Sequence, residues 1–163
     1  LSTTITSVYN RLMNIRPIKA GDLDSLVLLG RQAHAEGAFS QLDYDHRKIY
    51  SLLQRCVGDQ NYFCAVAETS PGAIVGVQIS VLNEYWIERD LIAEERVRYV
   101  LPSFRKTSKA GYYLTQEFVA WAEQKGAKEL VAGTTLGIDT EGVKDFYERQ
   151  GFDSVGYIFK KRI

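Results

Sequence analysis

Two hydrophobic periods alternate along the chain and predict its elements. Apolar residues at every second position predict half-buried strands, and apolar residues three or four positions apart predict helices. The predicted strands cover residues 15–19, 61–68, 73–82, 94–101, 129–134 and 153–160. The predicted helices cover residues 22–37, 43–57, 109–124 and 141–149. The last strand depends on Val155, Tyr157 and Phe159, which stand at alternate positions.

The connections between these elements indicate the fold class. Ser70-Pro71-Gly72 is a turn sequence, so the strands on either side of it are predicted to form a hairpin. Residues 83–91 are aromatic and charged, which indicates a loop or a bent strand end. Asp22 and Thr140 are expected to cap the helices that follow them. The order β-α-α-β-β-β-α-β-α-β mixes hairpins with crossovers and indicates an α+β or mixed α/β layer fold.

Composition narrows the class of protein. The chain has 163 residues, 45% of them hydrophobic and 25% charged, which is typical of one soluble domain. Its formal net charge is zero, so no general attraction to nucleic acid or membrane is expected. No apolar run is long enough to span a bilayer, and residues 1–10 are polar rather than typical of a signal peptide. We therefore expect a cytoplasmic protein that neither crosses a membrane nor binds nucleic acid.

The sulfur and imidazole groups do not form a recognisable metal motif. Cys56 and Cys64 lie on apolar faces of a predicted helix and strand and are expected to be small buried hydrophobes. Neither has a partner at metal-ligand spacing, and His34 and His46 do not supply one. We expect no bound metal.

The segment from Val100 to Gly111 is the most informative part of the chain. It joins a predicted strand to a predicted helix through a short connection that is basic, carries hydroxyl groups and ends in glycine. Unpaired amides at a helix N-terminus, the helix dipole and nearby cations favour a phosphorylated ligand. The alternative interpretation is a basic turn that simply faces solvent.

Two motifs in this chain resemble those of the GNAT superfamily of acyl-CoA-dependent N-acetyltransferases. Val100-Leu101-Pro102-Ser103-Phe104-Arg105, continued to Gly111, is similar to the family's cofactor motif, and 146–152 (FYERQGF) is similar to its late Y-x-x-x-G-F signature. Ile15-Arg16-Pro17 is also family-like. The resemblance covers roughly residue 14 to the C-terminus. It implies one domain over 14–163 after an N-terminal extension over 1–13, with a central, mostly antiparallel twisted sheet flanked by helices.

The resemblance also implies acetyl-CoA as cosubstrate. It assigns cofactor binding to the strand end, the connection and two residues of the late helix: Tyr99, Val100, Leu101, Arg105, Lys106, Thr107, Ser108, Lys109, Ala110, Gly111, Thr140 and Tyr147. By the family pattern, a bulge over 99–101 would free backbone amides for the pantetheine arm, and Pro102 would end the strand. The chain departs from the motif in its glycines. When the motif is aligned on Arg105, its two glycine positions hold Ser108 and Ala110. When it is aligned on the following helix, its last glycine position holds Gly111.

The catalytic candidates follow from the chemistry of thioester aminolysis. Tyr147 matches the family tyrosine, and a phenol that is protonated at neutral pH can donate to a leaving thiolate. Glu84 and Glu95 are candidate bases that could deprotonate the amine through a water. His34 and Glu36 could instead line the acceptor site. Four aromatic residues near predicted loops could shape an acceptor pocket, form a core edge or make a dimer contact: Phe39, Tyr44, Tyr85 and Trp86.

The expected function is transfer of an acetyl group from acetyl-CoA to a primary amine, by direct attack in a ternary complex. The acceptor would be a small molecule or a peptide, and a homodimer is an open alternative to a monomer. One rival is a non-catalytic acyl-CoA-binding or sensing module of the same fold. A second rival is an interaction or nucleic-acid module, against which the zero net charge argues. It would use Arg96, Arg98, Arg105, Lys106 and Lys109.

Overall fold

The computed structural model describes residues 13–69 and 72–163, so the predicted extension over residues 1–13 lies almost wholly outside the described residues. The strands are β1 (Met13–Pro17), β2 (Tyr62–Thr69), β3 (Ala73–Glu84), β4 (Leu91–Val100) and β5 (Glu129–Val131). The helices are η1 (Ala20–Asp22), α2 (Leu23–Glu36), α3 (His46–Gly58), α4 (Pro102–Arg105), α5 (Ala110–Gln124) and α6 (Thr140–Glu148). The alternation of strands and helices confirms the predicted mixed α/β class.

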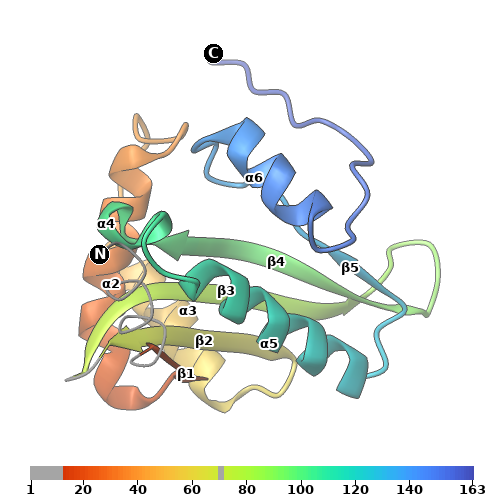
Figure 1. Cartoon of the computed structure of the whole chain (residues 1–163), viewed down its shortest axis with the longest axis horizontal. Helices are drawn as coiled ribbons and strands as arrows, with labels where there is room; N and C mark the ends of the chain where they lie inside the picture. Colours follow the sequence, from red (N-terminus) through yellow and green to blue (C-terminus); the bar gives the residue numbers. More distant parts are fainter. Residues whose placement is uncertain (1–12, 70–71) are drawn as a thin grey trace, which may run out of the picture.

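The five strands form one sheet in the order β1-β2-β3-β4-β5. The first four strands are antiparallel neighbours, whereas β5 runs parallel to β4. In Figure 1, α5 lies in front of the sheet, α2 and α3 lie behind it, and α6 lies above β4. This is the twisted, mostly antiparallel sheet flanked by helices that the sequence motifs imply.

The alternation along the strands divides the core into two layers. Val66, Val77 and Ile79 belong to the layer that packs against α2 and α3. Phe63 and Ala65 belong to the layer against α5, where Phe118 is fully buried. Successive strand residues point to opposite faces, so a single strand supplies both layers.

The last predicted strand does not form. Residues 153–160 have no strand structure, and Val155, Tyr157 and Phe159 are 94%, 87% and 90% exposed. Alternating apolar residues indicate which side chains would share a face of an extended chain, but a β-strand also needs a hydrogen-bonded neighbouring strand. β5 is likewise shorter than the predicted 129–134, because β4 pairs with it only as far as Glu94 and Val131.

The residues that cap the helices differ from the predicted ones. Asp139, not Thr140, caps α6 by accepting the Gly142 amide, and Asp45 caps α3 in the same way. The Asp22 side chain accepts a hydrogen bond from the Lys19 amide and binds Arg16 instead of capping α2.

In the part of the chain that the structure describes, no helix has the length and apolar character needed to cross a membrane.

Candidate functional site

The candidate site forms where two neighbouring strands, β4 and β5, separate. β4 and β5 pair only over Ile92–Glu94 and Glu129–Val131, and beyond these residues the two strands diverge. A cavity of about 560 Å³ opens there. One wall is the end of β4, α4 and the start of α5, and the other is the 133–139 connection with α6. An open end between parallel strands is a usual place for a ligand site.

A β-bulge in β4 sets the side chains that face this cavity. Ile79 pairs with Val97, but the next residue of β3, Ser80, pairs with Glu95, so Arg96 is the extra residue. Residues three apart on a regular strand point to opposite faces, and the bulge brings Glu95 and Arg98 onto the same face. The family pattern places the bulge over 99–101, whereas here Tyr99 and Val100 keep regular register with β3.

Glu95, Arg98 and Tyr147 form one hydrogen-bonded cluster. The Tyr147 hydroxyl, from α6, donates to Glu95 Oε2. Arg98 Nε donates to the same phenol oxygen at 3.1 Å and lies 3.7 Å from Glu95 Oε2. The Arg98 guanidinium also lies 4.0 Å from the centroid of the Phe146 ring. The structure thus joins two of the predicted catalytic residues, and it adds Arg98.

Burial controls the protonation of this cluster. Glu95 and Tyr147 are each only 6% exposed. Burial raises the pKa of the Glu95 carboxyl, and the Arg98 charge and the Tyr147 hydrogen bond offset only part of that rise. Burial and then the Glu95 charge raise the pKa of the Tyr147 phenol, so the phenol holds its proton at neutral pH. The cluster therefore holds a proton on the Tyr147 hydroxyl, beside a Glu95 carboxyl whose pKa burial raises.

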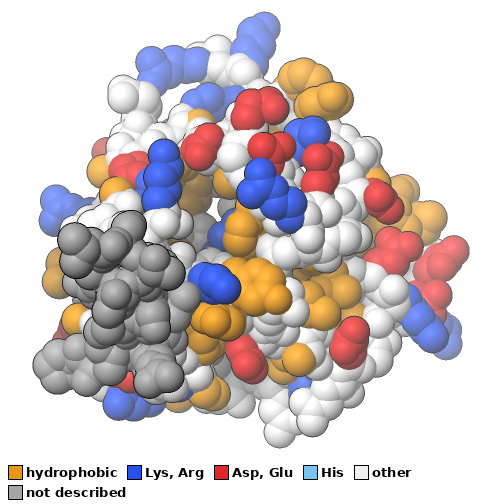
Figure 2. Space-filling view, in the orientation of Figure 1, with side chains coloured by type: hydrophobic (Ala, Val, Ile, Leu, Met, Phe, Trp, Pro, Cys, Tyr) orange, Lys and Arg blue, Asp and Glu red, His pale blue; other side chains and the backbone are white. Residues whose placement is uncertain are grey.

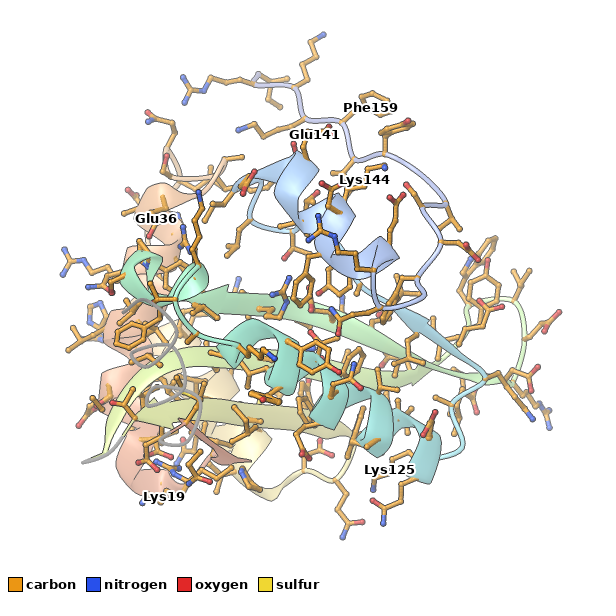
Figure 3. The ribbon with its side chains drawn as sticks, viewed as in Figure 1. Lys19, Glu36, Lys125, Glu141, Lys144 and Phe159 are labelled. Atoms are coloured by element: carbon orange, nitrogen blue, oxygen red, sulfur yellow. The ribbon has the colours of Figure 1, made fainter. Side chains whose placement is uncertain are left out.

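Arg105 joins α4 to its neighbours. Its Nε donates to the Val100 carbonyl at 2.7 Å, and its Nη2 donates to Glu36 Oε2 at 2.8 Å. The Tyr99 hydroxyl donates to the other Glu36 oxygen, and burial followed by this hydrogen bond raises the pKa of Tyr99 to about 12. Figure 3 shows Glu36 beside α4, at the end of α2. Arg105 and Tyr99 line the cavity while bound to Glu36.

The connection before α5 presents backbone donors to the cavity. Ser108 closes the turn through Phe104, since its amide and its hydroxyl both donate to the Phe104 carbonyl. The first amide of α5, Ala110, donates weakly to Ser108 Oγ at 3.3 Å. None of the residues in the described ranges offers an acceptor to the next two amides, Gly111 and Tyr112. These amides lie at the positive end of a fifteen-residue helix.

Gly111 has a second property that the sequence does not reveal. A Cβ atom at Gly111 would lie 2.8 Å from Arg98 Nη1. The absence of a side chain therefore makes room for the guanidinium that binds Tyr147. This contact links the predicted cofactor loop directly to the cluster of Glu95, Arg98 and Tyr147.

The other predicted residues divide into two groups. Most of the predicted cofactor residues line the cavity: Tyr99, Val100, Arg105, Lys106, Thr107, Ser108, Lys109 and Gly111. Leu101 and Ala110 pack in the core instead, and Thr140 is exposed at the start of α6. Glu84 pairs with Leu91 at the far end of the β3–β4 hairpin, about 13 Å of strand from Glu95.

Some cavity residues were absent from the predicted site. Arg98 appeared only as a surface cation, because regular alternation places it opposite Glu95. The 133–139 connection was also missed; it holds Gly137 at φ 65°, packed against Ala38. Its only sequence signal is the pair of glycines at 133 and 137.

No protein-family model matches this sequence, and no curated protein matches it. Solved structures do match. The aminoglycoside acetyltransferase AAC(6')-Iy, bound to a CoA bisubstrate analogue, aligns with TM-score 0.74 and 16% identity over 93% of this chain and 97% of its own. Glucosamine-6-phosphate N-acetyltransferase from Arabidopsis thaliana gives 0.71 and 15%, over 92% and 97%. A transcriptional regulator from Bacillus halodurans C-125 gives 0.72 and 18%, over 93% and 99%. The chain therefore has the GNAT fold.

Proposed function

We propose that this protein is an acetyl-CoA-dependent N-acetyltransferase that acts on a primary amine. One observation carries the proposal: the cavity between β4 and β5 is lined by free helix-terminal amides at the start of α5 and by Glu95 and Arg98, which both hydrogen-bond the buried, protonated phenol of Tyr147. The oxygens of a diphosphate need hydrogen-bond donors such as these amides, and a leaving thiolate needs a proton donor such as this phenol. The GNAT fold of the neighbouring acetyltransferases supports this assignment.

The residues at the start of α5 fit the diphosphate of coenzyme A. Gly111 and Tyr112, whose amides have no acceptor among the described residues, line the cavity, and Lys106 and Lys109 add positive charge beside them. Charge-assisted hydrogen bonds of this kind contribute about 1.5–3 kcal/mol each. Acetyl-CoA, when bound, supplies the thioester that the amine attacks.

The cluster of Glu95, Arg98 and Tyr147 would control the proton at the leaving group. Tyr147 holds a proton on its hydroxyl that the departing sulfur can take. Arg98 Nε already donates to the phenol oxygen and would stabilise the phenolate that remains. The Glu95 carboxylate can take the proton that the incoming amine loses and pass it to the phenolate oxygen, which restores the Tyr147 hydroxyl.

The function is tested by measuring free-thiol release from acetyl-CoA with a panel of amines, alongside calorimetric binding of acetyl-CoA. Polyamines, aminoglycosides, amino sugars and peptides cover the main acceptor classes. Thiol release that requires one acceptor class supports the proposal. Binding of acetyl-CoA without turnover for any acceptor favours the sensing module, and no binding at millimolar concentration rejects both interpretations.

The charge pattern does not favour the nucleic-acid alternative. Among its five candidate cations, Arg98 and Arg105 already form hydrogen bonds with groups of the protein, and Arg96 Nη2 lies 3.1 Å from Glu94 Oε2. Figure 2 shows basic and acidic side chains intermixed on the face that it presents. A polyanion surface would need a continuous patch of one sign.

A further inference from the structure

We propose that Ser80 and Gln78, on β3, hold buried water against Glu95 and Arg98, and that they act as positioning residues for the cluster of Glu95, Arg98 and Tyr147. The water site depends only on the geometry of the sheet, whereas its part in acetyl transfer rests on the proposed function. Ser80 and Gln78 are not among the residues that line the cavity. The site therefore lies beneath the cluster, inside the protein.

Gln78 and Ser80 are polar side chains without access to solvent. Both are 0% exposed. Gln78 Nε2, Gln78 Oε1 and Ser80 Oγ have no hydrogen-bond partner among the described residues. A buried polar group without a partner is destabilising, and native proteins satisfy nearly all such groups with protein atoms or ordered water. Three such atoms on two neighbouring positions of one strand face therefore indicate a bound ligand.

The register of the sheet places these two side chains beside the cluster. Ser80 pairs with Glu95, and Gln78 pairs with Arg98. Directly paired residues of antiparallel strands share a face, with their Cβ atoms about 4.5–5.5 Å apart. On its other side Gln78 pairs with Ala65, which belongs to the core layer against α5. Each β4 residue of the cluster thus has an unpartnered polar residue directly across the strand pair, on the face that α5 covers (Figure 1).

The unpartnered atoms require a ligand that both donates and accepts hydrogen bonds. Gln78 Oε1 only accepts, Gln78 Nε2 only donates, and the Ser80 hydroxyl can do both. A cation would leave the amide nitrogen without an acceptor, and an anion such as chloride would leave the amide oxygen without a donor. Water satisfies both kinds of atom and adds no charge between Arg98 and Glu95. Water is therefore the ligand that fits this site.

Water held by Ser80 would act on the Glu95 carboxyl. Three groups already lower the pKa of that carboxyl against the effect of burial: Arg98 on its own strand, Tyr147 on α6 and the Gly133 amide. A carboxylate has about four lone-pair positions, so it has room for a further donor. A donating water favours the charged form of the carboxyl, which is the form that takes a proton from the incoming amine.

Water held by Gln78 would act on the Arg98 guanidinium. Arg98 Nε donates to the Tyr147 phenol oxygen at 3.1 Å, and the guanidinium has five N–H donors in all. An acceptor on the side of Gln78 would restrain the guanidinium in the orientation that points Nε at the phenol. The two β3 residues therefore position the two β4 groups that bind Tyr147.

The water is detected directly by NMR, through cross-relaxation between water and the side-chain amide protons of the 15N-labelled chain. Long-lived buried water should give the Gln78 amide a cross-peak with the sign of a dipolar contact, and the cross-peak should weaken in Ser80→Ala. The side-chain amide of Gln54, which is exposed on α3, is the internal control and should show only short-lived hydration water. A Gln78 amide without such a cross-peak overturns the proposal.

The positioning role is measured by NMR titration of the Glu95 carboxyl carbon. Ser80→Ala removes one holder of the donating water, so the pKa of Glu95 should rise by about half a pH unit or more. Ser51→Ala on the exposed side of α3 is the matched control and should leave this pKa unchanged. Circular dichroism confirms that the variants fold. A Glu95 pKa that is the same in Ser80→Ala and the wild type overturns the positioning role.

Thiol release then connects the water site to catalysis. Ser80→Ala and Gln78→Met should lower the turnover number several-fold and leave the KM for acetyl-CoA within about twofold, because neither residue lines the cavity. Gln54→Met is the control for the second substitution. Wild-type turnover in both variants overturns the positioning role. A wild type that releases no thiol rejects the proposed function, whereas the cross-peak and the titration decide the water site without any activity.

Discussion

At the scale of single residues, the proposed chemistry depends on the contact of Tyr147 with Glu95 and Arg98. Sequence motifs and chemistry marked Tyr147 and Glu95 as candidates, whereas Arg98 comes from a position that looks ordinary in the sequence. Burial gives the cluster its chemistry, because a low-dielectric surrounding strengthens its hydrogen bonds and raises the pKa values of Glu95 and Tyr147. Three predictions belong to this scale.

Tyr147→Phe should lower the turnover number at least about tenfold, because it removes the proton that the leaving sulfur takes. The acetyl-CoA dissociation constant should change by less than about twofold, since Tyr147 is buried and the amides proposed to bind the cofactor lie at the start of α5. Steady-state thiol release and calorimetry measure the two quantities. Tyr50→Phe on α3 is the control, and an equal turnover in both variants would remove Tyr147 from the mechanism.

Glu95→Gln should change how stability depends on pH. The folded state holds the pKa of Glu95 above the ordinary 4.5, so the folded protein binds this proton more tightly than the unfolded chain does. The contribution of Glu95 to stability is therefore present at low pH and is lost as the pH rises above about 4.5.

Glutamine does not titrate, so the stability of Glu95→Gln relative to the wild type should rise between about pH 4 and pH 8. Urea unfolding at a series of pH values measures this difference. Glu123→Gln, on the exposed side of α5, is the control for removing one negative charge. Parallel curves for the wild type and Glu95→Gln would show that the carboxyl has no raised pKa.

Gly111→Ala should impair function without unfolding the protein. The added Cβ would meet the flexible end of Arg98, which can move, while alanine favours the helix by up to about 1 kcal/mol. If Arg98 moves, its hydrogen bond to the Tyr147 hydroxyl breaks, so the turnover number should fall several-fold. Acetyl-CoA should also bind more weakly. Gly58→Ala is the matched control, because its Cβ meets nothing within 4 Å. Unchanged kinetics would mean that Arg98 does not act on Tyr147.

At the scale of elements, the bulge at Arg96 and the cap at Asp139 place the residues of the cluster. The bulge turns Glu95 toward Arg98, and the cap fixes the start of the helix that carries Tyr147. Asp139 has φ 46°, a left-handed conformation that aspartate tolerates better than most residues. Both features are local, yet each determines whether side chains from distant segments meet.

Asp139→Ala should destabilise the protein by about 1 kcal/mol, because the Gly142 amide loses its acceptor. Thr140→Ala should cost less than about 0.5 kcal/mol, since Thr140 is exposed and does not cap the helix. Chemical denaturation of both variants measures the difference. A larger effect at Thr140 than at Asp139 would restore threonine as the cap.

At the scale of the whole molecule, the cavity lies between two parts that pair only weakly. β4 and β5 share three paired positions, and beyond them α5 and α6 face each other across the opening. A ligand that contacts both walls should stabilise the fold as a whole. Acetyl-CoA at a hundred times its dissociation constant should add about 2.7 kcal/mol to the free energy of unfolding.

Thermal melts at rising acetyl-CoA concentration test this coupling. The midpoint should rise steadily with the logarithm of the ligand concentration, and Tyr147→Phe should follow the same curve as the wild type. Pantetheine, which lacks the diphosphate, should produce a much smaller shift at equal concentration. An equal shift with pantetheine would mean that the amides of α5 do not bind the diphosphate.

The predicted elements were most accurate where the sequence signal is local. The helices over α2, α3, α5 and α6 and the hairpin of β2 and β3 are within a few residues of their predicted ranges. The motif singled out Tyr147 among ten tyrosines, and Glu95 was one of two proposed bases. Arg98 was not predicted as part of the active site, because regular alternation places its side chain on the face opposite Glu95. Nothing in the local sequence marks Arg96 as the extra residue of a bulge.

The sequence by itself determined the class of fold, the helix that carries Tyr147 and the basic connection before α5, because periodicity, turn residues and motif spacing act over short distances. Only the tertiary structure decided that the bulge joins Glu95 to Arg98, that Arg105 binds Glu36, and that residues 153–160 remain unpaired. These outcomes depend on which neighbours each backbone and side chain finds in space. Alternation along a chain cannot specify that choice.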